Sequence, residues 1–253
     1  MRVTPIFLSL TSMMVGTILN ALGILIGGIV GLTANKQPSP ARQNILKIGM
    51  GALTVFFGLQ MTVLSFRGSL LSWFKQLLII VLAMMAGKII GSLLRLQKRL
   101  NRLGQFAKGK LAQARPDNPQ RVSDGLITCA ILFCMGPIAI FGALADGLEG
   151  NWKILAIKAL MDSLAMMAFV KVFGWGALLA VVPVVAYQGT ISICAHSLAP
   201  DLAEHALLAP VTATLGLLVF SVALVILEIK KVELADYLPS LVIAPLLTLL
   251  WHW

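Results

Sequence analysis

Residues 14–34 read MVGTILNALGILIGGIVGLTA, an apolar run without a charged side chain. An α-helix needs about 20 apolar residues to cross the hydrocarbon core of a bilayer, so this run predicts a transmembrane helix. Similar runs recur to the end of the chain and predict an all-α polytopic membrane protein with about eight transmembrane helices. We expect the spans at roughly 14–34, 49–66, 77–94, 124–144, 154–170, 176–195, 210–227 and 238–253.

The composition indicates the same class of protein. Hydrophobic residues make up 58% of the 253 residues and charged residues 12%, whereas soluble proteins carry about 25% charged residues. A net charge of +10 is also typical of nucleic-acid-binding proteins. Here the basic residues lie between apolar runs, so membrane topology explains them and no nucleic-acid partner is expected.

The sequence contains no motif for catalysis or for a cofactor. It has no P-loop, nucleophile elbow or HExxH pattern, so we expect neither an enzyme nor a cofactor. The three cysteines, Cys129, Cys134 and Cys194, lie in apolar runs without metal-ligand spacing. We therefore interpret them as packing residues, and no metal site is expected.

The 95–121 segment predicts the orientation of the chain. It contains eight basic residues: Arg95, Lys98, Arg99, Arg102, Lys108, Lys110, Arg115 and Arg121. The positive-inside rule places such a segment in the cytoplasm. Counting spans outward from it then places loop 35–48 inside and both termini outside.

The loops expected outside are mostly acidic. Loops 145–153 and 196–209 contain Asp146, Glu149, Asp201 and Glu204, with Lys153 as the opposing charge. The 67–75 loop runs against the rule, because it would carry Arg67 and Lys75 on the outer side.

The basic segment also has a helical pattern. Leu96, Leu100, Leu103 and Leu111 recur near helical spacing between the cations. This pattern favours an amphipathic helix on anionic lipid headgroups. A plain solvated loop remains the alternative.

An internal repeat is the second large-scale feature. Residues 16–34 and 125–143 match at six of nineteen positions, including Gly27 with Gly136. A three-helix unit repeated once reverses its direction in the membrane, and inverted repeats recur in secondary transporters. The expected organisation is an N-terminal extension (1–13), a first three-helix repeat (14–94), a basic cytoplasmic amphipathic loop (95–123), a second, inverted three-helix repeat (124–195) and a C-terminal helical hairpin (196–253).

Small residues and helix breaks mark the first candidate positions. Gly23, Gly27 and Asn20 share one face of the first span, where small residues allow close helix packing. Gly27-Gly28 and Gly136-Pro137 occupy corresponding positions of the two repeats. Paired interruptions of this kind indicate a transporter site, although packing explains either one alone.

Ionisable and amide side chains supply the remaining candidates. Asp162 lies in the middle of the fifth span, with Lys158 one turn before it, and Gln188 lies in the sixth span. A buried acid indicates a coupling site for a proton or cation, and a structural ion pair is the alternative. The sequence predicts that Asn20, Gly27, Gly28, Gly136, Pro137, Lys158, Asp162 and Gln188 surround one polar cavity.

The chain resembles the bacterial YdfK/YqgA-type membrane family, domain of unknown function 554. The resemblance is carried by MVGTILNALGILIGGIVG (14–31), LFCMGPIAIFGALADGLEG (132–150), KALMDSLAMMAF (158–169), AYQGTISICA (186–195) and LPSLVIAPLL (238–247). It implies a polytopic protein of the bacterial inner membrane and names no substrate. Ser92 departs from the acid that the family pattern implies there, which weakens any coupling role for the third span.

We therefore expect a secondary transporter or channel-like carrier of a small solute or ion. Its expected partners are membrane lipid and, in a homo-oligomer, further copies of the same chain. The alternative is a membrane scaffold or regulatory protein without transport, because each polar feature also has a structural explanation.

The orientation predicts which positions an impermeant thiol reagent reaches in intact cells, once the native cysteines are replaced. Cysteines introduced at Glu149 and Glu204 should be labelled, and cysteines at Lys108 and Lys230 should be protected. Labelling of position 108 from outside would overturn the topology.

Overall fold

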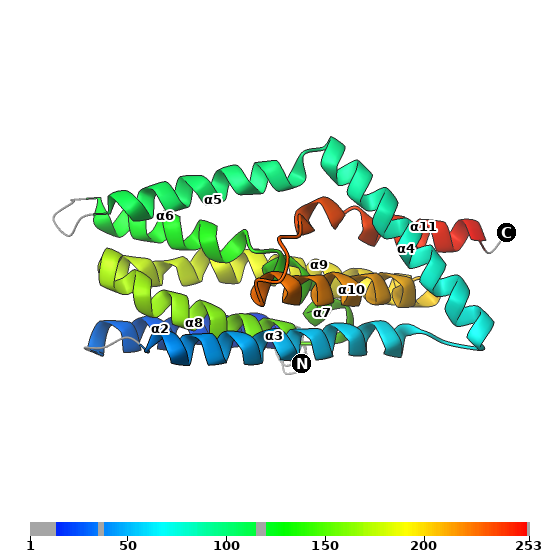
Figure 1. Ribbon diagram of the computed structural model, residues 1–253, viewed down its shortest axis with the longest axis horizontal. Helices are drawn as coiled ribbons and strands as arrows, with labels where there is room; N and C mark the ends of the chain where they lie inside the picture. The colour runs from blue at the N-terminus through cyan, green and yellow to red at the C-terminus, as the bar shows by residue number, and fades with distance from the viewer. Residues whose placement is uncertain (1–13, 35–37, 115–119, 252–253) are drawn as a thin grey trace, which may run out of the picture.

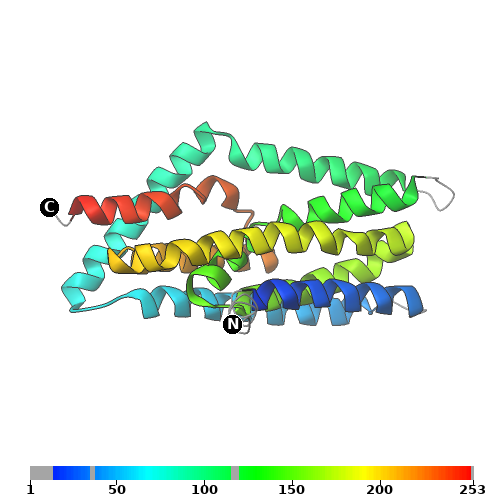
Figure 2. The same cartoon turned by 180° about the vertical axis from the view of Figure 1, so that it is seen from behind.

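The computed structural model describes residues 14–34, 38–114 and 120–251, and these residues form an elongated helical bundle without a strand (Figures 1 and 2). The α-helices are α2 (Val15–Thr33), α3 (Pro40–Ser65), α4 (Leu70–Leu93), α5 (Leu96–Gln113), α6 (Arg121–Cys134), α7 (Pro137–Glu149), α8 (Lys153–Phe173), α9 (Val181–Glu204), α10 (Leu208–Ile226) and α11 (Ser240–Trp251). The 3-10 helices η1 (Gly174–Ala180) and η2 (Leu234–Tyr237) precede α9 and α11. The all-α class is confirmed.

Six stretches within the described residues are long and apolar enough to cross a membrane, and the bent pair of α6 and α7 makes a seventh if it counts as one span. One of the six, Lys153–Glu204, contains both α8 and α9. These two helices meet at η1 and run back in opposite directions (Figures 1 and 2). The number of eight spans stays a prediction.

Several helices begin or end beyond their apolar runs. α3 begins at Pro40, where the Ser39 Oγ accepts a hydrogen bond from the Arg42 N–H and proline occupies the first turn. α9 continues to Glu204. Loops 35–48 and 196–209 are therefore shorter than the sequence predicts, because polar residues extend a helix where hydropathy no longer marks it.

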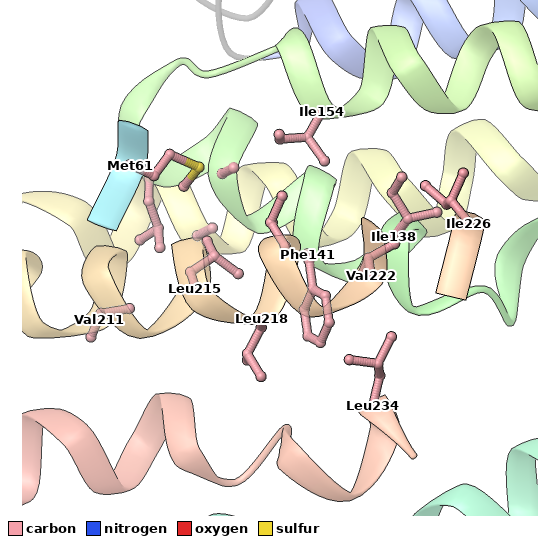
Figure 3. Close-up of a cluster of buried hydrophobic side chains, with 14 residues drawn as sticks. Met61, Ile138, Phe141, Ile154, Val211, Leu215, Leu218, Val222, Ile226 and Leu234 are labelled. Atoms are coloured by element: carbon pink, nitrogen blue, oxygen red, sulfur yellow. The ribbon is translucent and has the colours of Figure 1, made fainter. Parts of the chain in front are cut away.

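The buried apolar side chains form two clusters. The first gathers around α7 and α10, with Phe141, Leu215 and Leu218 fully buried (Figure 3). The second joins α2, α6, α8 and η1 through Ile24, Phe133 and Met166. Large apolar side chains elsewhere point outward, as a bilayer permits.

The basic segment forms helix α5, as its pattern predicts. α5 runs beside α6 in both views (Figures 1 and 2), where Ala107 is buried and Lys110 pairs with Asp124 at 3.0 Å. Its start is held by Asp236, which accepts the Gln97 N–H at 2.8 Å. One face of α5 thus contacts protein, and its contact with lipid headgroups stays a prediction.

A close helix contact joins α2 to α8. A Cβ atom at Gly23 would lie 2.7 Å from the Ala159 carbonyl oxygen, and one at Gly27 would overlap the backbone of Ser163. Neither backbone can move away without opening the helix pair. The small-residue face of α2 therefore serves packing, as the spacing predicts.

The inverted repeat stays a prediction. α2 and α6 run in opposite directions along the long axis (Figures 1 and 2). A superposition of the two triplets after a half-turn about an axis in the membrane plane would test it.

We predict that Gly27→Ala destabilises the protein by about 1–3 kcal/mol, because the new methyl group meets backbone in a well-packed interface. Gly49→Ala is the matched control in α3, where a methyl group on the α-carbon would find nothing within 4 Å. It should leave the protein unchanged or stabilise it by up to about 1 kcal/mol. Thermal unfolding in detergent measures both, and equal melting temperatures would contradict the packing assignment.

Candidate functional site

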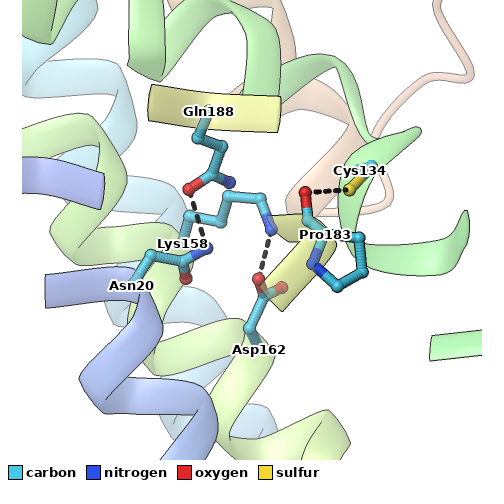
Figure 4. A network of polar contacts seen from close by, with 6 residues as sticks. All are labelled: Asn20, Cys134, Lys158, Asp162, Pro183 and Gln188. Carbon is cyan, nitrogen blue, oxygen red and sulfur yellow. Dashed lines mark hydrogen bonds and ion pairs between the residues drawn. The ribbon is translucent and has the colours of Figure 1, made fainter. Parts of the chain in front are cut away.

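Four polar side chains meet between α2, α8 and α9 (Figure 4). Lys158 Nζ donates to Asp162 Oδ2, one turn further along α8. Asn20 Nδ2 donates to Gln188 Oε1 at 3.1 Å. Lys158 is 2% exposed, Asp162 is 7% exposed, and both amides are fully buried. We call these four residues the polar cluster.

The α2–α8 contact positions the polar cluster. Asn20 lies on the same face of α2 as Gly16, Gly23 and Gly27, and that face packs on α8. Because the glycines bring the two backbones together, the short side chain of Asn20 lies beside the Lys158–Asp162 pair (Figure 4). The sequence predicts this shared face of α2 and places Asn20 and Gln188 around one cavity, but it does not predict the hydrogen bond between them.

The helix break predicted at Gly136-Pro137 lies next to the polar cluster. It separates α6 from α7 with a bend of 63°, and Pro137 occupies the first turn of α7, where no intrahelical N–H is required. The last turn of α6 brings the Phe133 ring centroid to 5.7 Å from Lys158 Nζ. Cys134 Sγ lies 3.9 Å from the Pro183 carbonyl oxygen (Figure 4).

The remaining two candidates are packing residues. Gly27 lies against the backbone of Ser163, and Gly28 lies against Leu178 in η1. Neither position has room for a ligand beside its α-carbon. A cavity of about 900 Å³ elsewhere in the protein is lined by none of the eight predicted residues.

Two atoms of the polar cluster are buried without a partner among the described residues. These are Asn20 Oδ1, an acceptor, and Gln188 Nε2, a donor, and the hydroxyl of Thr17 nearby in α2 is in the same state. Buried polar atoms are paired in nearly all native proteins, so unpaired ones indicate a missing ligand, water or ion. The polar cluster can therefore accept both a hydrogen-bond donor and an acceptor.

The sequence prediction is wrong for one acidic residue. It places Asp146 in an outer loop, but α7 continues to Glu149 and Asp146 is a buried helical residue, 1% exposed. Its Oδ2 accepts a hydrogen bond from the Gly16 N–H at 3.0 Å. A carboxylate is favourable at a helix N-terminus, so Asp146 holds the start of α2. The apolar residues around it are the signal that marks it as buried.

The chain belongs to the family described as "Protein of unknown function (DUF554)", whose model matches residues 15–249. It is 28% identical over 240 residues to "Uncharacterized membrane protein YdfK" of Bacillus subtilis (strain 168), covering 94% of this chain and 97% of the relative. It is 27% identical over 242 residues to "Uncharacterized protein YqgA" of Escherichia coli (strain K12), covering 94% and 98%. No solved structure matches the chain.

We predict an energetic coupling between Asn20 and Gln188. Either single alanine substitution leaves the other amide with an unsatisfied buried group, which costs about 1–3 kcal/mol. The double variant Asn20→Ala/Gln188→Ala should cost less than the sum, with a coupling of about 0.6–1.7 kcal/mol, as measured for such bonds in membranes. Denaturant unfolding in mixed micelles measures the cycle, and strictly additive effects would show that the two amides do not interact.

Proposed function

We propose that this family member is a secondary transporter or channel-like carrier of a small solute or ion across the bacterial inner membrane, with both termini outside. The observation that carries the proposal is the buried Lys158–Asp162 pair, beside which the Asn20 and Gln188 amides are also buried (Figure 4). Asn20, Lys158 and Gln188 lie in helices long and apolar enough to cross a membrane.

The cost of these charges supports a function for them. A charged residue at the centre of a membrane helix costs about 2.5–3.5 kcal/mol on insertion scales, and such residues commonly mark ion and solute pathways. Apolar residues of similar volume replace buried ion pairs at little or no cost in stability. A purely structural contact between helices therefore does not require this pair.

The polar cluster provides two states for a coupling mechanism. In the first state Asp162 pairs with Lys158. In the second, a proton or small cation binds the Asp162 carboxylate in place of Lys158. The unpaired atoms Asn20 Oδ1 and Gln188 Nε2 would then contact polar groups of the solute, beside the break between α6 and α7.

The alternative function is a membrane scaffold or regulatory protein that transports nothing. The glycine contacts between α2 and α8 favour it, because they hold the polar cluster in a tightly packed interface. Transport would require this interface, or the α6–α7 break beside it, to change shape.

Reconstituted liposomes containing a pH-sensitive dye test the proposal. Proton movement is recorded after addition of a sodium gradient and of a panel of amino acids, carboxylates and sugars. At least one condition should drive flux through the unmodified protein, and Asp162→Asn should reduce that flux at least tenfold, because the exchangeable charge is lost.

The double variant Lys158→Met/Asp162→Leu separates transport from stability. Replacing both charges avoids an unpaired buried lysine, which would cost about 3–5 kcal/mol. The double variant should keep its melting temperature and show no flux. Flux that persists in it, or an unmodified protein that moves no ion or solute under any condition, would favour the scaffold.

A further inference from the structure

A second candidate site is a cavity of about 900 Å³ that lies apart from the polar cluster. It is lined by the end of α3, the start of α4, the turn between α7 and α8, the end of α9, the start of α10 and the end of α11. Small-molecule sites have volumes of about 300–1,000 Å³. The cavity is therefore large enough for a metabolite or a lipid headgroup.

The charged residues that line the cavity are mostly positive. Arg67, Lys75 and Lys153 contribute cations, and Glu149 contributes the one acid of the lining. Among the described residues, none of the three cations forms an ion pair with a carboxylate, since the ion pairs there involve Lys47, Lys110 and Lys158.

The segment that carries Arg67 is held in place before any ligand binds. Gln76 Nε2 donates to the Arg67 carbonyl at 2.9 Å, and the Arg67 N–H donates to Gln76 Oε1 at 3.4 Å. Gly68 has φ +91°, a conformation that a side chain disfavours. Ser69 then caps α4 by accepting the Ser72 N–H. A preorganised loop loses less entropy when it binds a ligand.

Two further features of the lining indicate a polar ligand near the membrane surface. Asn151 Oδ1 is buried without a partner among the described residues, in the turn that begins α8. Trp152 and Trp251 contribute to the lining and remain partly exposed. Tryptophan concentrates at the interface between membrane and water, which places the cavity near that level.

We infer that this cavity binds a small organic anion through a carboxylate or phosphate group that contacts Arg67 and Lys75. Arginine and lysine are the side chains that bind these groups most strongly. Arg67 precedes α4 and Lys75 lies in its second turn, and neither has a carboxylate partner among the described residues. Both are expected on the outer side, against the positive-inside rule, and a ligand explains why they are there. This inference is independent of the proposed transport function, because a binding experiment alone tests it.

The same chemistry has two sources, a free solute or the headgroup of an anionic lipid. Titration calorimetry of the purified full chain in a neutral detergent distinguishes them. The probes are succinate, inorganic phosphate and short-chain phosphatidylglycerol, with glucose as a neutral control.

The double variant Arg67→Gln/Lys75→Gln should weaken the binding of the anionic probe at least tenfold. The matched control is Lys230→Gln/Lys231→Gln, which removes the same charge from two exposed positions after α10 and should bind as the unmodified protein does. The single variant Lys75→Gln, expected to weaken binding to a smaller extent, replaces the double variant if that protein does not fold.

Loss of succinate or phosphate binding in the Arg67→Gln/Lys75→Gln variant would assign the cavity to a free anion. Loss of phosphatidylglycerol binding alone would assign it to a lipid headgroup. The inference is overturned if none of the three anionic probes binds, or if the double variant binds them as tightly as the control does.

Discussion

The close contact between α2 and α8 is the constraint on which the polar cluster depends. Glycine at positions 23 and 27 brings the two backbones together, and at this separation Asn20 lies beside the Lys158–Asp162 pair of α8 and donates a hydrogen bond to Gln188 on α9 (Figure 4). Lipid supplies no hydrophobic force between helices, so such contacts rely on packing and on interhelical hydrogen bonds. The same interface therefore provides the stability of the bundle and the geometry of the candidate site.

Local patterns in the sequence predict the local structure. The apolar runs predict the helices, the leucine spacing predicts α5, and the interval of four residues predicts the Lys158–Asp162 pair, because one helical turn joins those positions. Contacts between distant segments leave no comparable signal. Asn20 and Gln188 are 168 residues apart, and hydropathy contains no information about which helices become neighbours.

The sequence analysis misplaces some helix ends and the position of Asp146, and both errors have a physical explanation. Hydropathy detects the part of a helix that lies in hydrocarbon, so it misses the polar turns that extend α3 and α9. It also assigns each acid after an apolar run to a loop. Asp146 is buried because its carboxylate satisfies the N-terminus of another helix, and that helix lies 130 residues away in the sequence.

The end of α7 connects the two candidate sites. Asp146 accepts the Gly16 N–H at the start of α2, and Asn20 of the polar cluster follows one turn later on the same helix. Glu149, one turn beyond Asp146, lines the cavity. A shift of α7 relative to α2 must break the hydrogen bond between Asp146 and Gly16, which would leave a carboxylate and an amide unpaired in a buried position. Because of the break at Gly136-Pro137, α7 does not continue along the axis of α6. α7 is thus the element whose movement would change the cavity and the polar cluster together.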